Sequence, residues 1–169
     1  MDTLTKEVLK IKLIKDYPNL IRVDTGDYRS SLTTAAKNVR IELKVAFPGV
    51  KFSVKTERYS GGDSISVGWI DGPTGKQVEA ITKKYQGGSF NGMEDIYEYT
   101  DNPFVDLFGE AKYVFGERER SNELIQRCLA ELAAQGYPAV TVEEYRSGRC
   151  GYGEMDRTIN LKICDTVGV

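Results

Sequence analysis

The sequence of 169 residues contains no histidine, and this absence removes whole classes of chemistry. Serine–histidine and cysteine–histidine nucleophilic pairs, HExxH metalloproteases and most zinc hydrolases all need an imidazole. A histidine-based pH switch is excluded for the same reason. Any enzyme of this composition would have to use carboxylates, lysine, tyrosine or cysteine alone. We therefore predict that the chain is not an enzyme and that it uses no cofactor.

Cysteines and long apolar segments are also scarce. Cys128, Cys150 and Cys164 are an odd, widely spaced set that fits neither a disulfide framework nor a zinc site, and Cys128 is predicted to be a buried apolar residue. No apolar run approaches the roughly 18 residues of a membrane helix. Residues 1–15 alternate lysines with aliphatics, unlike a signal peptide. We expect a chain that stays in the cytoplasm and contacts no membrane.

The net charge is only −2, but it is unevenly distributed. Lys and Arg outnumber Asp and Glu in residues 1–60, whereas the acids predominate in residues 61–120. Such a chain is not attracted to nucleic acid as a whole, so any phosphate binding must be local.

The length predicts a single domain over residues 1–169 that can bury a sizeable core. Apolar residues at helical spacing predict helices over residues 30–46 and 121–134. Residues 4–15 also fit a helix, although the alternation of Lys10 to Leu13 fits a strand, and we favour a helix that ends before Tyr17–Pro18.

Alternating apolar residues predict two β-hairpins. The first joins residues 50–54 to 65–69, and the second joins residues 140–142 to 159–163 through a long loop. Further expected elements are a helix over 74–85, short strands over 96–99 and 112–115, and a short helix that begins at Asn102–Pro103. This mixture predicts the α+β class, with antiparallel hairpins forming a sheet and helices packed on one side.

Several motifs in the middle of the chain occur in an order that resembles a known family. They are Ala35–Lys44, Phe47–Val54, Tyr59–Ile65, Trp69, Asp71–Thr74 and Lys84–Tyr99. Over about residues 33–118 the chain resembles the large polyvalent protein-associated domain numbered twenty-nine in its series. Residues 1–32 and 119–169 are then N- and C-terminal elaborations of this core.

The resemblance implies an origin in phages or mobile elements. There the family occurs in very large proteins thought to enter the bacterial cell with incoming DNA and to protect it from host defences. A short stand-alone copy is then expected to be a counter-defence protein. The resemblance carries no catalytic residues.

Residues 85–111 combine acidic with aromatic side chains and contain no Lys or Arg. Packed aromatics with solvated acids would explain this pattern, and so would an acidic docking patch that faces a basic partner. The patch would use the following residues: Glu94, Asp95, Glu98, Tyr97, Tyr99, Asp101, Phe104 and Asp106. Its partner would be a host defence protein or ribonucleoprotein complex. Glu94–Asp95 lacks a convincing third ligand, so no metal site is predicted.

Two basic features are candidates for nucleic-acid binding. Arg146, Arg149 and Tyr152 lie in the glycine-containing loop over residues 145–153, and arginine beside a stackable ring suits single-stranded nucleic acid. Lys37, Arg40 and Lys44 line one face of the predicted helix over residues 30–46. We favour the plainer explanations, a hairpin loop for the first pattern and a solvated helix face for the second.

Three functions therefore stay open. The leading one is a phage or mobile-element interaction protein, similar in action to anti-CRISPR inhibitors, that blocks a nucleic-acid or subunit surface of a host defence complex. The alternatives are a nucleic-acid-binding accessory module and a histidine-free enzyme that modifies a host factor. The sequence indicates neither the target nor the oligomeric state.

Overall fold

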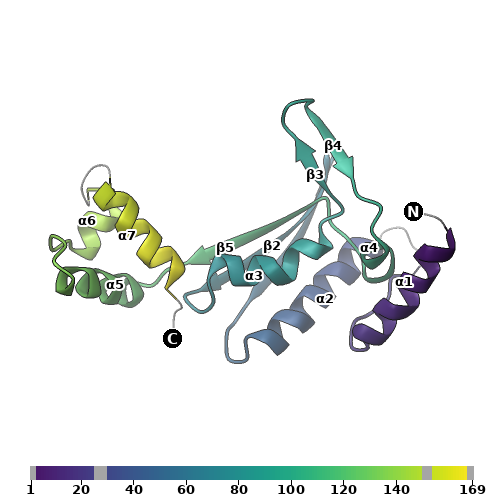
Figure 1. Ribbon diagram of the computed structural model, residues 1–169, viewed down its shortest axis with the longest axis horizontal. Helices are drawn as coiled ribbons and strands as arrows, with labels where there is room; N and C mark the ends of the chain where they lie inside the picture. Colours follow the sequence, from purple (N-terminus) through teal and green to yellow (C-terminus); the bar gives the residue numbers. More distant parts are fainter. Residues whose placement is uncertain (1–2, 25–29, 150–153, 167–169) are drawn as a thin grey trace. The chain divides into compact units, whose positions relative to one another are not determined.

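The structure is a computed structural model that describes residues 3–24, 30–149 and 154–166 (Figure 1). Its helices, together with one short 3-10 helix, are interspersed with antiparallel strand pairs, and the α+β class is confirmed. The elements are α1 (Thr3–Asp16), α2 (Ser30–Ala46), β1 (Ser53–Tyr59), β2 (Gly62–Ile70), α3 (Gly75–Thr82), η1 (Lys83–Tyr85), β3 (Gly88–Asn91), β4 (Ile96–Tyr99), α4 (Pro103–Phe108), β5 (Tyr113–Glu119), α5 (Asn122–Ala134), α6 (Val142–Arg146) and α7 (Glu154–Asp165).

The chain divides into two compact units. The first comprises Met1–Gly68 and Val78–Glu117, and the second comprises Trp69–Gln77 and Arg118–Val169. Each unit is described by itself below. Because contact density alone does not define an independently folding domain, one domain over residues 1–169 stays a prediction.

The first unit is built on a three-stranded sheet with the order β1-β2-β5. The predicted hairpin of β1 and β2 is confirmed, with Val54 opposite Val67 and Thr56 opposite Ile65. The predicted helix α2 is also confirmed, and it packs against β1. The apolar spacing that predicted α2 is the spacing of its buried side, since Leu32, Ala36, Val39 and Leu43 are all buried.

Asn38 is a polar residue within this core, and its side chain is fully buried. Its Nδ2 donates to the carbonyls of Ile21 at 2.8 Å and Phe108 at 2.9 Å, and its Oδ1 accepts from the Ile21 amide at 2.8 Å. One side chain of α2 therefore holds both the segment after α1 and the end of α4.

Helix α4 ends against α2 at Gly109. The residue has φ 88°, and a Cβ there would lie 2.3 Å from the Ser31 carbonyl oxygen. Only glycine fits both the backbone conformation and this close approach. The start of α4 agrees with the sequence prediction, because Asn102 accepts from the Phe104 amide and Pro103 occupies the first turn.

The second unit has its own hydrophobic core between α5 and α7. Its buried residues are Leu124, Ile125, Cys128, Leu129, Leu132, Ile159 and Ile163. The predictions of helix α5 and of a buried Cys128 are confirmed. Cys164 is half-buried, and Cys150 lies outside the described residues.

The predicted hairpin of residues 140–142 and 159–163 is wrong, because both segments contribute to helices. Ile159 and Ile163 are 1% and 0% exposed, whereas Leu161 is 52% exposed. Residues four apart share one side of a helix, so the alternating isoleucines fit α7 as well as a strand. Thr141 begins α6 with a capping box that uses Glu144, which is a helix-start pattern.

Arg118 joins α7 to the turn after β2 within this second unit. Its guanidinium donates to the carbonyls of Asp71 at 2.8 Å, Gly72 at 3.3 Å, Cys164 at 3.0 Å and Thr166 at 2.7 Å. Burial, followed by the nearby charge of Arg120, lowers the pKa of Arg118 below its usual value.

Candidate functional site

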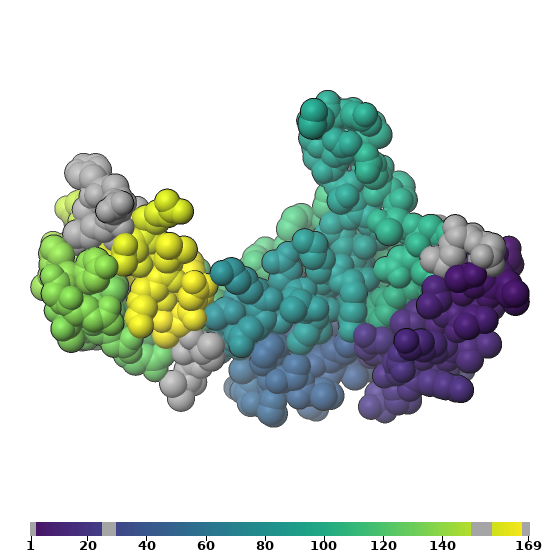
Figure 2. All heavy atoms as spheres, in the orientation of Figure 1, coloured from purple at the N-terminus to yellow at the C-terminus, as the bar shows by residue number. Residues whose placement is uncertain are grey.

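The β3–β4 hairpin presents exposed apolar side chains on the first unit. It pairs Gly88 with Tyr99 and Asn91 with Ile96, and Figure 2 shows it standing out from the rest of that unit. Four large side chains are exposed along it: Phe90 at 53%, Met93 at 97%, Ile96 at 48% and Tyr99 at 72%. Strand β4 was predicted, whereas β3 was not.

Three of the predicted acids, Glu94, Asp95 and Glu98, are exposed on this hairpin. Glu98 accepts from the Asn91 side chain at 2.7 Å, so its carboxylate is oriented by the opposite strand. No Lys or Arg occurs between Gly88 and Tyr99. The hairpin therefore presents apolar side chains and negative charge together.

Tyr97 attaches the hairpin to the body of the first unit instead of lying exposed. Its hydroxyl donates to the Lys112 carbonyl at 2.5 Å, and its ring meets those of Tyr99 and Tyr113 edge to face. Burial, followed by the neighbouring tyrosines, raises the pKa of Tyr97 to about 12. Tyr97 therefore positions the hairpin, and its contact with a partner stays a prediction.

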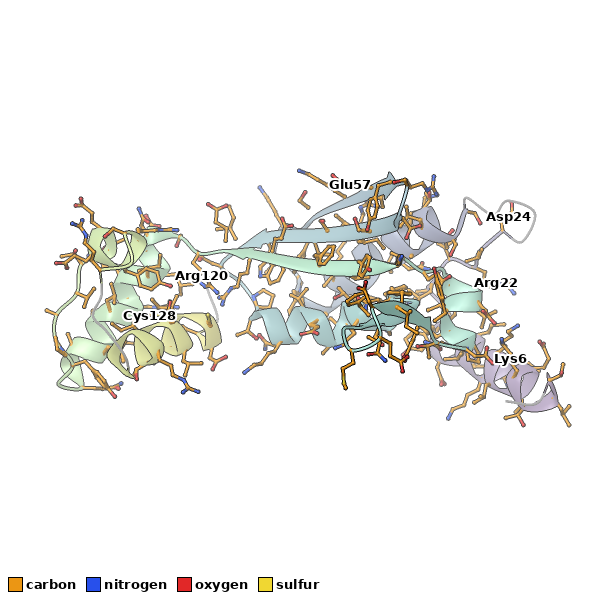
Figure 3. All side chains as sticks on the ribbon, turned by 90° about the horizontal axis from the view of Figure 1, so that it is seen from above. Lys6, Arg22, Asp24, Glu57, Arg120 and Cys128 are labelled. Atoms are coloured by element: carbon orange, nitrogen blue, oxygen red, sulfur yellow. The ribbon has the colours of Figure 1, made fainter. Side chains whose placement is uncertain are left out.

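Asp101 and Asp106, which were also predicted to belong to the acidic patch, form ion pairs with α1, and their contact with a partner stays a prediction. Lys6 contacts Asp101 at 2.5 Å and Asp106 at 3.0 Å, and Lys10 lies 3.7 Å from Asp106. Helix α1, whose Lys6 is labelled in Figure 3, has no buried residue, and these ion pairs are among its contacts with the segment around α4. The predicted α1 helix itself is confirmed.

Phe104 was also predicted to contact a partner, and the structure contradicts this. Phe104 is 6% exposed and lies at ring-centroid distances of 5.3 Å from Tyr17, 5.1 Å from Tyr85 and 5.0 Å from Phe108. These rings form an aromatic core under α4. For Phe104, the alternative explanation, in which the aromatic side chains pack inward, is correct.

The basic side of α2 is where the sequence placed it. Lys37, Arg40 and Lys44 are all exposed. Arg40, however, also donates to the Val54 carbonyl of β1, so it supports the packing of α2 on the sheet. Nucleic-acid binding by this face stays a prediction.

The predicted arginine loop lies at the end of a helix and not at the tip of a hairpin. Arg146 is the last residue of α6 and donates to the Arg120 carbonyl at 2.6 Å and to Asn122 Oδ1 at 3.1 Å. Arg149 is exposed and donates to Ser147 Oγ at 2.8 Å. Tyr152 lies outside the described residues.

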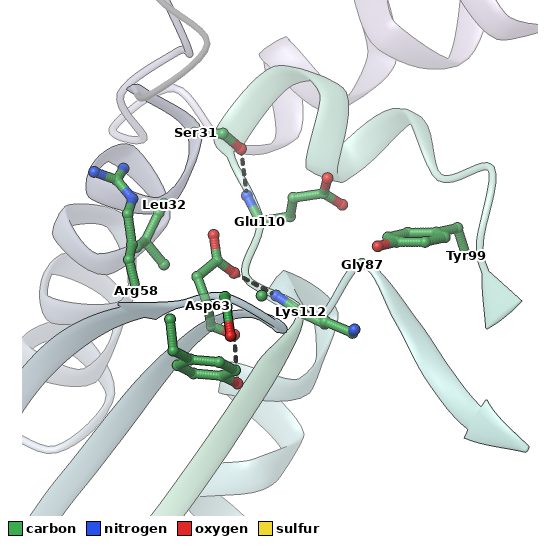
Figure 4. Close-up of a pocket in the computed structure, with 11 residues that line it drawn as sticks. Ser31, Leu32, Arg58, Asp63, Gly87, Tyr99, Glu110 and Lys112 are labelled. Atoms are coloured by element: carbon green, nitrogen blue, oxygen red, sulfur yellow. Dashed lines mark hydrogen bonds between the residues drawn. The ribbon is translucent and has the colours of Figure 1, made fainter. Parts of the chain in front are cut away.

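A pocket of about 750 Å³ opens at the foot of the β3–β4 hairpin in the first unit (Figure 4). Asp63 lies there between Arg58 and Lys112, and the Glu110 side chain extends toward Tyr99. The Lys112 amide donates to Asp63 Oδ1 at 2.8 Å. Because these residues come from distant parts of the chain, no local sequence pattern indicated them.

Glu110 is the electrostatically unusual residue of this pocket. Burial raises its pKa, and the negative charges of Asp63 and Asp106 raise it further. Gly87 leaves room for the carboxylate, since a Cβ there would lie 2.2 Å from Glu110 Oε2. Among the residues that the structure describes, no group of three or more Cys, Asp or Glu side chains could hold a metal ion. The pocket therefore provides paired carboxylates with flanking cations.

Replacing Glu110 by glutamine is expected to stabilise the protein at neutral pH. The raised pKa means that folding disfavours the ionised carboxylate, so stability falls as the pH rises through the folded-state pKa. Because solvent screens this half-buried group, we expect a gain of only about 0.5 kcal/mol at pH 7. Denaturant unfolding from pH 4 to pH 8 measures it. A gain that does not shrink toward acid pH would contradict the assignment.

Comparison with known proteins identifies the family. The model of large polyvalent protein associated domain 29 matches residues 30–121, more than half of the chain. The chain belongs to this family. The family domain runs from the first residue of α2 to the N-cap of α5 and includes the hairpin and the pocket. No curated protein and no solved structure matches the chain.

Membership in large polyvalent protein associated domain 29 makes the chain a phage or mobile-element associated protein. The resemblance seen in the sequence over about residues 33–118 is thereby confirmed, and the match is slightly longer at both ends. Over the described residues, no helix is long and apolar enough to cross a membrane. Helix α1 and all of α5 to α7 lie beyond the family domain.

Proposed function

We propose that this protein is a non-enzymatic interaction protein of a phage or mobile element, and that its β3–β4 hairpin binds a host defence protein or ribonucleoprotein complex. One observation carries the proposal: a hairpin that presents four exposed apolar side chains and three acids without a single cation. Blocking a nucleic-acid groove or subunit surface of that complex would make the protein a counter-defence factor, similar in action to an anti-CRISPR inhibitor.

The exposed apolar side chains would supply most of the binding energy. Met93 and Tyr99 are 97% and 72% exposed. Because burying a large apolar side chain contributes about 1.5–3 kcal/mol, a partner that covered them would gain binding energy. Aromatic and methionine side chains are enriched where proteins bind one another. Their gathering on one short hairpin favours a protein partner with an apolar cleft.

The acids define the charge of that partner. Glu94, Asp95 and Glu98 would repel nucleic acid and attract a basic surface, such as the groove in which a defence complex holds its DNA or RNA. Fixed negative charge speeds the encounter and opposes wrong partners. A hairpin of this composition could occupy such a groove in place of the nucleic acid.

A non-enzymatic action is part of the proposal. The absence of histidine supports it, because the commonest general base is missing. The Asp63 and Glu110 pocket provides carboxylates, but Asp63 already accepts a hydrogen bond from the Lys112 amide, so one of its oxygens is engaged in holding the backbone. Stoichiometric binding, and not turnover, is therefore the expected mode.

The test is capture of the partner from nuclease-treated bacterial lysate by two matched charge variants. The first, Glu94→Lys with Glu98→Lys, changes the hairpin. The second, Glu57→Lys with Glu117→Lys, makes the same change of charge on exposed residues of β1 and β5. We expect near-equimolar partner with the wild type and the second variant, and at least about a tenfold loss with the first.

Circular dichroism and thermal unfolding confirm that both variants fold. Equal recovery of the partner by both variants would show that the hairpin does not bind it. If the wild type instead retains only nucleic acid, and only when nuclease is omitted, the accessory nucleic-acid module becomes the better function. Modified host protein without a stable complex would favour an enzyme.

A further inference from the structure

A second recess, of about 510 Å³, lies wholly within the second unit. Arg118 and Arg120, at and just after the end of β5, line it together with Arg146 at the end of α6. Tyr145 and Asn160 complete its polar wall. Figure 3 labels Arg120. Ligand pockets in proteins usually measure about 300–1,000 Å³, so the recess has room for a small ligand.

The positive charge in this recess is poorly compensated. Within the described part of the chain, no acid forms an ion pair with Arg118, Arg120 or Arg146. Glu119 also lines the recess but is exposed, and the Asp71 carboxylate near Arg118 accepts from the Ser121 amide at 2.8 Å. Three guanidinium groups therefore gather around one cavity with little opposing charge.

The arginines differ in the hydrogen bonds that they leave open. Arg118 is largely satisfied by four backbone carbonyls and contributes mainly its charge. Arg120 donates from Nη2 to Cys164 Sγ at 3.1 Å, whereas its buried Nε has no partner among the described residues. The hydrogen bonds that Arg146 forms within the described part of the chain come from Nη2. A buried guanidinium N–H without a partner is costly, and a bound anion would satisfy it.

We propose that this recess binds a phosphate group. Paired guanidinium donors match phosphate oxygens in geometry and charge, and arginine is the preferred residue for such sites. Tyr145 is held in the wall by a 3.2 Å hydrogen bond from its hydroxyl to Asn160 Oδ1. The phosphate could belong to a small phosphorylated molecule or to the backbone of a nucleic acid. The site shares no residue with the hairpin, so it does not depend on the proposed function.

The direct test measures binding of two probes by single arginine variants of the full chain. The probes are inorganic phosphate, followed by isothermal titration calorimetry, and a fluorescein-labelled short oligothymidine, followed by anisotropy at low and physiological salt. Arg146→Gln removes a recess cation, and Arg157→Gln removes an exposed cation of α7 outside the recess. Arg120→Gln and Arg120→Lys separate loss of charge from loss of geometry.

We expect Arg146→Gln and Arg120→Gln to weaken binding at least about tenfold, with Arg157→Gln unchanged within about twofold. Arg120→Lys should recover little, because an ammonium cannot replace the fork of donors. Phosphate binding identifies a small-molecule source, and binding of oligothymidine alone identifies nucleic acid. Either result supports the site when it depends on the recess. No binding of either probe, or equal loss with Arg157→Gln, would overturn it.

Discussion

Replacing Asn38 by leucine is expected to lower the free energy of unfolding by about 2–4 kcal/mol. The substitution fits the volume of the site but removes three hydrogen bonds at once. The Phe108 carbonyl is then left buried without a partner, whereas water can reach part of Ile21, which is 44% exposed. Urea unfolding followed by circular dichroism measures the loss. A change below about 1 kcal/mol would mean that these carbonyls find other donors.

Asn38→Asp provides a matched control for this prediction. The carboxylate can still accept from the Ile21 amide, but it faces two carbonyls that need a donor. When it is protonated it can donate to one of them, so the variant should be less destabilised at pH 4 than at pH 8. Asn38→Leu should show no such dependence on pH relative to the wild type. Parallel pH profiles for the two variants would contradict the assigned geometry.

The second large effect is expected at Arg118. Arg118→Met keeps the apolar part of the side chain but removes four hydrogen bonds to carbonyls, and we expect a loss of about 3–5 kcal/mol from the second unit. Fluorescence of Trp69, which is buried in the second unit, can follow this unit.

Arg118→Lys tests whether the geometry or the charge is important. A single ammonium cannot reach the Asp71 and Gly72 carbonyls and also those of Cys164 and Thr166, so the lysine variant should be nearly as unstable as the methionine variant. Arg157→Met, an exposed substitution on α7, the helix to which Arg118 is hydrogen-bonded, should change stability by less than about 0.5 kcal/mol. Full stability of Arg118→Lys would assign the role to charge alone.

Much of the first unit was predictable because local signals agreed. The spacing of Leu32, Ala36 and Leu43 predicted α2, and alternation around a glycine turn predicted the β1–β2 hairpin. Strand β3 was missed because Gly88–Asn91 contains no β-branched residue. Long-range packing, more than local preference, makes it a strand.

The C-terminal segment was mispredicted because one pattern fitted two structures. Ile159, Leu161 and Ile163 alternate as a strand does, yet the two isoleucines are also one helical turn apart. The Thr141–Glu144 capping box was the local signal that favoured a helix. Weighing that box against the alternation would have predicted α6 correctly.

The candidate sites were less predictable because distant residues assemble them. Lys6 forms ion pairs with Asp101 and Asp106, which are far from it in the sequence, and no sequence spacing indicates these pairs. Arg120 and Arg146 meet only because α6 returns to the end of β5. The exposed acids lie on one hairpin and are close together in the sequence, so the sequence alone indicated them. They are Glu94, Asp95 and Glu98.

The β3–β4 sheet has only two strands, which bears on the affinity of the proposed partner. A two-stranded hairpin is only marginally stable by itself, so we expect its backbone to open at a low local free energy. If the proposed partner binds the closed form, the population of that form scales its apparent affinity. Tyr97 holds the hairpin closed through the Lys112 carbonyl and the ring of Tyr113. The strength of the proposed binding at the tip would therefore be adjustable from the base, through a residue that need not contact the partner.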